Sequence, residues 1–373
     1  MPKHVVMIIA NSPNPSYFSW FAEINAKEKA FKFTFVFLCL EKPQVTIDKI
    51  ANYGAESKWY YFNYATKKHI QYIKLFFKLF FLFRKIKPDV VQTNLFDDSL
   101  PGLLAAKLAG VKKRVITKQD TGFHLRYAPK GIRYDIFNNT NATDIIPVSQ
   151  ESFELIMKHE KPDATKVKII HHGVNQNFMD SATQAEIESI KSEFNLHNKT
   201  VIGTVARYVE LKGYKEVIEA AAILNKTKNN LVFIGVGWGP KKEELDNLIK
   251  QLHLEDKFLL PGRIEFDKIP AFYKCLDIYV HASHYEPFGF VIAEAMFSKV
   301  PIVSTNVGAS RDVLLHKDSA YIAKMQDPDD LAAGINYILN ANKKEIAEKA
   351  YKIGIERFSK EVMWNNYKNL FLA

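Results

Sequence analysis

Short apolar segments alternate with longer segments of helical pattern along almost the whole chain. The apolar segments lie at residues 4–10, 32–40, 88–94, 114–118 and 142–149, and again at 199–207, 230–237, 257–263, 277–283 and 301–306. Helical patterns, such as residues 100–109, lie between them. Uninterrupted apolar strands that alternate with helices are typical of parallel sheets with helices on both faces. The pattern therefore predicts an α/β fold with doubly wound parallel sheets.

Chain length and one break in the pattern predict two domains. A chain of 373 residues is long for a single core, and no apolar period runs through residues 172–190, where Gly, Asn and Ser gather. We expect a Rossmann-like domain at 1–175, a second one at 176–355 and an amphipathic C-terminal helix at 356–373. Ligands of such sheets bind outside the carboxyl ends of the strands, so we expect the site in a crevice between the domains.

The composition is typical of a globular protein in a reducing compartment, with 47% apolar and 25% charged residues. Both cysteines, Cys39 and Cys275, fall in apolar runs, which favours buried free thiols. The apolar run in the first ten residues is too short for a signal peptide. No uncharged apolar run reaches the roughly 18 residues that a membrane-spanning helix needs. We therefore expect a cytoplasmic protein.

The net charge of +10 belongs to the first half of the chain. Residues 1–175 hold 26 Lys and Arg against 15 Asp and Glu, whereas the remainder is nearly balanced, at 25 against 26. No recognised nucleic-acid-binding motif accompanies this charge, and the basic residues alternate with apolar runs, so we expect no nucleic-acid partner. A basic first half indicates an anionic surface partner for that half.

Residues 66–87 concentrate this charge. They contain seven Lys or Arg, no acid, and five phenylalanines between Phe76 and Phe83. One interpretation is a crossover helix that packs its apolar side on the sheet. The other is an interfacial helix, because apolar residues fill more than one face of a cationic helix. Both can hold, and we expect peripheral contact with an anionic membrane through residues 66–87.

The segment 281–301 carries two carboxylates, Glu286 and Glu294, with seven residues between them. An apolar strand leads into the segment, a Pro-Phe-Gly turn follows Glu286, and an apolar run then leads to Glu294. Free N–H groups at a helix N-terminus favour phosphate, and carboxylates accept hydrogen bonds from sugar hydroxyls. The segment thus predicts a site for a sugar joined to a diphosphate. The alternative is that the two glutamates only complement the helix dipole.

Two cations precede this segment in a matching context. Arg207 ends an apolar strand, and Lys212 lies five residues further on, directly before a glycine and an expected helix start. A guanidinium and an ammonium that reach the same point stabilise the negative charge on a departing diphosphate. The alternative is a solvated lysine and an arginine that pairs with Glu210. The presence of Glu286 and Glu294 downstream favours the phosphate clamp.

These strings resemble the donor-site signature of retaining GT-B glycosyltransferases, and more narrowly the large family four of hexosyl- and N-acetylhexosaminyltransferases. The resemblance covers most of the chain and is strongest at residues 148–340. It implies two Rossmann-like domains that face each other across a cleft, with the C-terminal helix packed back on the first domain. It also implies no metal cofactor, because in the family the cationic clamp and the helix N-terminus take the place of a nucleotide-bound cation. UDP is the commonest sugar carrier in the family.

The resemblance implies a role for each residue of the donor site. Arg207, Lys212 and Glu286 are the implied catalytic residues, with Glu286 facing the transferred sugar. Glu294 is implied to bind the ribose hydroxyls of the nucleotide. Backbone N–H groups for sugar and phosphate are implied to come from Phe288, Gly289 and Phe290. A tight turn near the nucleotide is implied at Gly237, and Arg263 and Ile264 are implied to lie beside the base.

Two departures from the family pattern concern the first domain. The loop after the first strand has no glycine, yet Asn11, Ser12 and Asn14 are expected to line the cleft. In the family's Thr-x-His string the histidine is replaced by Gln119, and Asp120 or His124 is expected to supply the missing polar contact. Retaining transfer in this fold needs little from a side-chain base, because the leaving phosphate can take the acceptor's proton. The departures therefore do not by themselves argue against activity.

The sequence predicts a retaining glycosyltransferase that moves a hexose or N-acetylhexosamine from a nucleoside-diphosphate sugar, UDP-linked by default, to a glycan or a lipid-linked or lipopolysaccharide acceptor. We expect it to be cytoplasmic and peripheral on the inner face of the membrane. The alternative is a non-catalytic nucleotide-sugar-binding protein of the same fold, which Gln119 and the glycine-free loop favour. His281 and His284 lie three residues apart, but no third ligand is nearby, so we expect no metal site.

Overall fold

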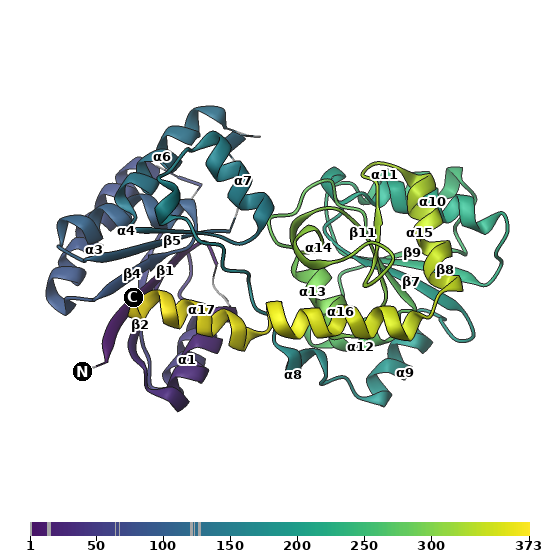
Figure 1. Ribbon diagram of the computed structural model, residues 1–373, viewed down its shortest axis with the longest axis horizontal. Coiled ribbons are helices and arrows are strands. Elements are labelled where there is room, and N and C mark those ends of the chain that lie inside the picture. The colour runs from purple at the N-terminus through teal and green to yellow at the C-terminus, as the bar shows by residue number, and fades with distance from the viewer. Residues whose placement is uncertain are drawn as a thin grey trace. The chain divides into compact units, whose positions relative to one another are not determined.

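The computed structural model divides into two compact units (Figure 1). The first unit is Met1–Gly173 together with Lys360–Ala373, and the second is Val174–Ser359. The structure describes residues 2–12, 16–63, 65–66, 68–119, 122, 124–125 and 128–373.

The first unit is built on a six-stranded parallel sheet of order β3-β2-β1-β4-β5-β6. Its strands are β1 Lys3–Ala10, β2 Phe31–Cys39, β3 Glu56–Tyr61, β4 Val90–Thr93, β5 Lys113–Lys118 and β6 Asp144–Pro147. The helices are α1 Ser16–Glu28, α2 Gln44–Ala51, α3 Lys68–Ile86, α4 Phe96–Leu108, α6 Ile132–Asn141, α7 Gln150–His159 and α17 Lys360–Leu372. Separate apolar clusters pack on the two faces of this sheet, one with α1 and α17 and the other with α3 and α4.

The second unit repeats the scheme with a six-stranded parallel sheet of order β12-β11-β10-β7-β8-β9. Its strands are β7 Thr200–Val205, β8 Leu231–Val236, β9 Phe258–Gly262, β10 Ile278–His281, β11 Ile302–Thr305 and β12 Tyr321–Ala323. The helices are α8 Gln176–Met179, α9 Gln184–Glu193, α10 Tyr214–Asn225, α11 Lys242–Gln251, α12 Ile269–Lys274, α13 Phe290–Phe297, α14 Gly308–Val313, α15 Pro328–Asn340 and α16 Lys343–Phe358.

The predicted fold class, two doubly wound parallel sheets, is confirmed, and every expected strand is present. Two further strands, β3 and β12, were not predicted. Both lie at an edge of their sheet, where one side of the strand has no neighbour. β3 alternates between exposed and partly exposed residues, and β12 has only three residues. Neither strand therefore shows the longer apolar run that reveals the other strands.

The last helix, α17, completes the core of the first unit and lies beside α1 in Figure 1. Trp364 is 1% exposed and packs edge-on against Phe21, with 5.3 Å between ring centroids. Its indole N–H donates to Glu28 Oε1 over 3.1 Å. The Tyr367 hydroxyl lies 3.0 Å from Thr117 Oγ1, within hydrogen-bonding distance, at the end of β5. The final residues of the chain are thus part of the core that the first residues begin.

Helix α3 has two apolar faces. Leu75, Leu79 and Phe83 are buried in the cluster on the sheet. The other face carries four exposed apolar side chains, with exposed fractions between 51% and 65%, namely Ile70, Ile73, Phe77 and Phe81. Within the described residues, no helix combines the length and the apolar character that crossing a membrane requires. The two cysteines, Cys39 and Cys275, are free and buried, as predicted.

Candidate functional site

A pocket of about 390 Å³ lies at the carboxyl ends of β7, β8, β9 and β10 in the second unit. Its walls include most of the residues predicted to bind the donor: Arg207, Lys212, Gly237, Arg263, Ile264, Glu286, Gly289 and Phe290. Neighbouring parallel strands end at the same edge of a sheet, so residues that are far apart in sequence meet there. We call this cavity the donor pocket.

Glycines bring the cations of the donor pocket into place. Gly213 has a φ of 67° and begins α10, and a Cβ on it would lie 2.0 Å from the carbonyl oxygen of Ala282. The turn that carries Lys212 therefore lies directly against the chain that follows β10. Gly237 plays a similar part after β8, since a Cβ there would lie 1.7 Å from the carbonyl oxygen of Ala206. These close approaches leave no room for a side chain.

Lys212 and Glu286 form an ion pair at the base of the pocket, and each side chain is 14% exposed. Arg207 lies on the pocket wall with its side chain exposed. The alternative pairing of Arg207 with Glu210 is not found in the described part of the chain. The guanidinium of Arg207 is therefore available to an anion in the pocket. The ammonium of Lys212 is paired with the carboxylate of Glu286, which also lines the pocket.

Helix α13 begins at Phe290, directly after Gly289, whose φ is 88°. Its first backbone N–H groups are at the pocket edge, because Gly289, Phe290 and Val291 all line the pocket. The side chain of Phe288 is 2% exposed and packs on Phe358 with 5.2 Å between ring centroids. Phe288 is thus a core residue, and any contact it makes with a ligand must come from its backbone.

Glu294 lies on α13, but its side chain is not among those that line the donor pocket. The Tyr273 hydroxyl donates to Glu294 Oε2 over 3.0 Å. Burial raises the pKa of Glu294 to about 7, while the hydrogen bond from Tyr273 acts in the opposite direction. This carboxyl group therefore changes its charge near neutral pH.

His281, at the end of β10, is a pocket residue to which the sequence assigned no role. It is 1% exposed, and its Nε2 lies 3.8 Å from Glu286 Oε2 and has no hydrogen-bond partner among the described residues. Burial, and secondarily the charge of Lys212, lowers the pKa of His281 to about 3, so the imidazole is neutral. Its position at the carboxyl end of a strand was the signal that sequence reasoning did not use.

His281 and His284 do not converge on a common point. His284 Nε2 lies 2.9 Å from Glu216 Oε1, on α10. Across the residues that the structure describes, no group of three or more His, Cys, Asp or Glu side chains has a geometry suited to a metal ion.

Trp238 is a second pocket residue that the sequence did not single out. It follows β8 and is 52% exposed, which is unusual for so large an aromatic side chain. The guanidinium of Arg263 lies over its ring, 4.0 Å from the centroid. The pair presents a flat, partly exposed surface at the pocket wall. The signal was an aromatic residue within the glycine-rich turn after β8.

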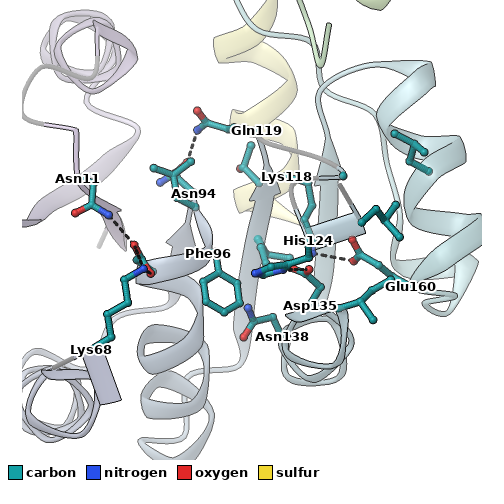
Figure 2. A pocket seen from close by; sticks show the side chains of 18 residues that line it. Asn11, Lys68, Asn94, Phe96, Lys118, Gln119, His124, Asp135, Asn138 and Glu160 are labelled. Atoms are coloured by element: carbon teal, nitrogen blue, oxygen red, sulfur yellow. Dashed lines mark hydrogen bonds and ion pairs between the residues drawn. The ribbon is translucent and has the colours of Figure 1, made fainter. Parts of the chain in front are cut away.

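A separate pocket of about 290 Å³ lies in the first unit, and we call it the polar pocket (Figure 2). Three of the predicted acceptor-side residues, Asn11, Gln119 and His124, line it. Ser12 is described but does not line it, and Asn14 and Asp120 lie outside the described residues. The structure therefore brings together part of the predicted set.

Hydrogen bonds fix the predicted residues of the polar pocket. Asn11 Nδ2 donates to Asp97 Oδ2 over 2.7 Å, and Gln119 Nε2 lies 3.3 Å from Asn94 Oδ1. His124 Nδ1 lies 2.5 Å from Asp135 Oδ2. Figure 2 marks these contacts with dashed lines.

The sequence analysis did not identify a cluster of charged side chains that lines the polar pocket. Lys118, at the end of β5, is 8% exposed and lies 2.8 Å from Glu160 and 3.4 Å from Asp135. The neutral side chain of Asn138, on α6, lines the same pocket. Asp135 and Asn138 both lie on α6, whereas Lys118 ends β5 and Glu160 follows α7, and no spacing in the sequence connects these three segments.

Known proteins resemble this chain over both units. The family model of glycosyl transferases group 1 matches residues 186–357, and that of glycosyltransferase family 4 matches residues 33–178. The capsular polysaccharide biosynthesis glycosyltransferase CapM of Staphylococcus aureus is 23% identical over 309 residues, which is 80% of each chain.

Solved structures share the fold over nearly the whole length. Anabaena Alr3699/HepE in complex with UDP and glucose superposes with a TM-score of 0.81 at 18% identity, over 99% of both chains. The apo form of the lipopolysaccharide outer core galactosyltransferase WaaB gives a TM-score of 0.76 at 16% identity, again over 99% of both chains. Two doubly wound sheets of this kind define the GT-B class of glycosyltransferases. Within that class, the chain belongs to glycosyltransferase family 4.

Proposed function

We propose that this protein is a retaining glycosyltransferase that transfers a hexose or N-acetylhexosamine from a UDP-sugar to a glycan or a lipid-linked acceptor. The observation that carries the proposal is the donor pocket itself. It combines an exposed guanidinium, an ammonium paired with a carboxylate, and the N-terminus of α13. This set fits a diphosphate with a sugar attached, since the cations bind phosphate and the carboxylate accepts from hydroxyls.

The residues of the donor pocket have different roles in the proposed transfer. Arg207 and Lys212 hold the diphosphate, with the N–H groups at the start of α13. As the bond from the sugar C1 to the phosphate oxygen breaks, negative charge grows on that oxygen, and these groups stabilise it. The acceptor oxygen forms its bond to C1 on the same face, and its proton passes to the departing phosphate. The anomeric configuration is retained, and these residues provide the charge stabilisation without a metal ion.

Glu286 and His281 lie where the transferred sugar is expected. The Glu286 carboxylate accepts hydrogen bonds from sugar hydroxyls and keeps Lys212 in position through their ion pair. His281 is neutral and has a free Nε2 in the pocket, so it adds one hydrogen bond to a hydroxyl without adding charge. The proposed polar contacts to the sugar thus come from the end of β10 and from the loop that follows it.

The nucleoside is proposed to lie against Trp238, Arg263 and Ile264. A base stacks on an exposed aromatic ring, and the guanidinium over that ring prevents its motion. Glu294 is the proposed acceptor for the ribose hydroxyls. UDP is the proposed carrier because HepE, which shares the fold, has been solved with UDP and glucose, and CapM is named for capsular polysaccharide synthesis.

The test combines binding with turnover. UDP-glucose and UDP-N-acetylglucosamine are expected to raise the midpoint of thermal unfolding more than the GDP- and ADP-sugars do. They are also expected to release UDP in the presence of an acceptor. Binding without turnover for every donor and acceptor tried would establish the alternative, a nucleotide-sugar-binding protein of the same fold. A donor that protects Arg207→Ala as fully as it protects the wild type would contradict the assigned pocket.

The protein is further proposed to work at the cytoplasmic face of a membrane, in peripheral contact through residues 66–87. Four side chains spaced along one face of α3, Ile70, Ile73, Phe77 and Phe81, are more than half exposed. The same helix carries several Lys and Arg and no acid. Exposed apolar side chains flanked by cations fit an anionic lipid surface, where each cation contributes roughly 1 kcal/mol.

Vesicle flotation tests this contact. Wild-type protein is expected to float with phosphatidylglycerol vesicles and to remain unbound with phosphatidylcholine. Replacing Ile73, Phe77 and Phe81 together by serine is expected to abolish flotation. The matched control is Val45→Ser, at a site that is 81% exposed and lies outside α3. Unchanged flotation of the triple variant, or equal flotation with both lipids, would contradict the proposal.

A further inference from the structure

The polar pocket contains a buried side chain whose hydrogen-bonding groups are both unused. Asn138, on α6, is 1% exposed, and neither its Oδ1 nor its Nδ2 has a hydrogen-bond partner among the described residues. The same side chain lines the cavity in Figure 2. A buried amide without partners is costly, so native proteins rarely keep one without a use. Neighbouring Asn139 differs, since its amide donates to Glu160 over 2.7 Å.

The lysine and histidine side chains that line this pocket already have carboxylate partners. Lys118 lies between Asp135 and Glu160, at 3.4 and 2.8 Å, and His124 lies against Asp135. Lys68, at the opposite wall, pairs with Asp97 over 3.1 Å. Within the described lining, no cation is left over to neutralise a phosphate or carboxylate. The pocket is therefore unsuited to an anionic ligand, which would face three carboxylates.

The lining also has an apolar side. Phe96 lies next to His124, with 4.6 Å between the ring centroids, and Leu95, Ile132 and Leu155 also line the cavity. The volume of about 290 Å³ is at the small end of the range of about 300–1,000 Å³ for ligand pockets. The ligand is accordingly a single ring, with an apolar surface and several neutral polar groups.

We propose that the polar pocket binds the terminal residue of the acceptor, and that this residue is a neutral polyhydroxylated ring, a sugar without phosphate or carboxylate. A hydroxyl group both donates and accepts, so a pair of ring hydroxyls satisfies both groups of Asn138. Asp135 and Glu160 accept from further hydroxyls, and the C–H face of the ring packs on Phe96. The inference rests on the proposed glycosyl transfer, since it assigns the acceptor's chemical class.

Direct binding tests the inference without requiring turnover. The probes are the methyl glycosides of glucose, galactose, N-acetylglucosamine and glucuronic acid, together with glucose 6-phosphate, followed by ligand-observed NMR on the full chain. At least one neutral glycoside is expected to bind, and the two charged probes are expected to bind more weakly. Asn138→Leu, which keeps the approximate shape but removes both polar groups, is expected to weaken neutral binding by about tenfold or more.

Controls separate this site from the fold and from the donor pocket. Thr140→Val lies on the exposed side of the same helix and is expected to leave glycoside binding unchanged. Asn138→Ser retains one polar group and is expected to bind with intermediate affinity, which shows that loss in the leucine variant is not unfolding. UDP affinity is expected to be equal in all of these variants.

Three results would overturn the inference: no neutral glycoside binds the wild type, the charged probes bind more tightly, or Asn138→Leu binds as the wild type does. Failure of the proposed function has a different signature. In that case UDP-sugars are not turned over with any acceptor, whether or not they bind and whatever the glycosides do.

Discussion

Lys212 and Glu286 show how two residues that lie far apart in sequence become one functional unit. They form an ion pair in which each side chain is largely buried, so neither charge is independent of the other. Removing one partner leaves the other charge uncompensated in a pocket that is proposed to hold a diphosphate. Their contributions to transfer are therefore expected not to be additive.

Lys212→Ala and Glu286→Gln are each expected to reduce kcat/KM by about 100- to 1,000-fold, as loss of one preorganised stabiliser of about 3–4 kcal/mol does. The double variant is expected to lose less than the sum of the two. The control is Lys215→Ala, an exposed lysine on the same helix that begins after Lys212. Steady-state kinetics with a UDP-sugar provide the measurement, and wild-type turnover in either single variant would show that the pair is not catalytic.

Glu294 gives the donor site a dependence on pH. Its pKa is raised to about 7 by burial, so the carboxyl group is neutral below that pH and ionised above it. An ionised carboxylate accepts hydrogen bonds from ribose hydroxyls more strongly than a neutral one. The affinity for UDP is thus expected to rise several-fold as the pH increases from about 6 to about 8. Calorimetry should show this rise, and Glu294→Gln should flatten it; an equally steep rise in that variant would assign it to another group.

At the scale of elements, the donor pocket depends on turns that pass very close to one another. Gly213 and Gly237 lie where a side chain would overlap a neighbouring carbonyl oxygen. The two turns hold the ends of β7, β8 and β10 together, and these ends carry Arg207, Trp238 and His281. The positions of these functional side chains follow from backbone packing, in which only glycine fits.

Gly237→Ala is expected to destabilise the second unit by about 1–3 kcal/mol and to abolish UDP binding, because the backbone must move to admit the Cβ. Gly110→Ala is a useful comparison: its φ of 86° adds strain, but nothing lies within 4 Å of the added Cβ. It is expected to cost only about 1–2 kcal/mol, in the first unit, and to leave UDP affinity intact. Unfolding and UDP titrations measure both effects, and tight UDP binding by the Gly237 variant would contradict the close-packing argument.

At the scale of the whole molecule, the chain ends in the unit where it begins. The segment Lys360–Ala373 belongs to the first unit, and Trp364 and Phe371 are among its largest buried apolar residues. Stability of the first unit therefore requires residues that the whole second unit separates from the rest of it in sequence. The second unit, Val174–Ser359, is inserted between the two parts of the first.

Trp364→Ala is expected to destabilise the first unit by about 3–5 kcal/mol, the usual cost of emptying a large buried aromatic site. Leu372→Ala, on the same helix but 49% exposed, is expected to change stability by about 0.5 kcal/mol or less. Chemical denaturation gives these values, and UDP should still stabilise the second unit of the Trp364 variant. A loss similar to that of Leu372→Ala would mean that α17 is not part of the core.

Much of this organisation was predictable from the sequence. Central strands are buried on both faces and therefore read as continuous apolar runs, which revealed β1 and β10 and predicted the fold class. Arg207, Lys212 and Glu286 follow strand ends or precede helix starts, and those positions converge in any parallel doubly wound sheet. The edge strands β3 and β12 were missed because β3 has exposed positions along its length and β12 has only three residues.

What only the tertiary structure decided is the set of contacts that no local pattern encodes. Asn138, Lys118 and Glu160 come from three elements and meet only because those elements pack around one cavity. Burial, and secondarily the charge of Lys212, lowers the pKa of His281 to about 3, and a linear sequence does not show this burial. Sequence periodicity records which side of an element is buried, whereas burial beside a particular partner depends on how the elements pack. The fold class and the meeting of Arg207 and Lys212 in one pocket could thus be predicted from the sequence, whereas the meeting of Asn138, Lys118 and Glu160 was decided by the packing.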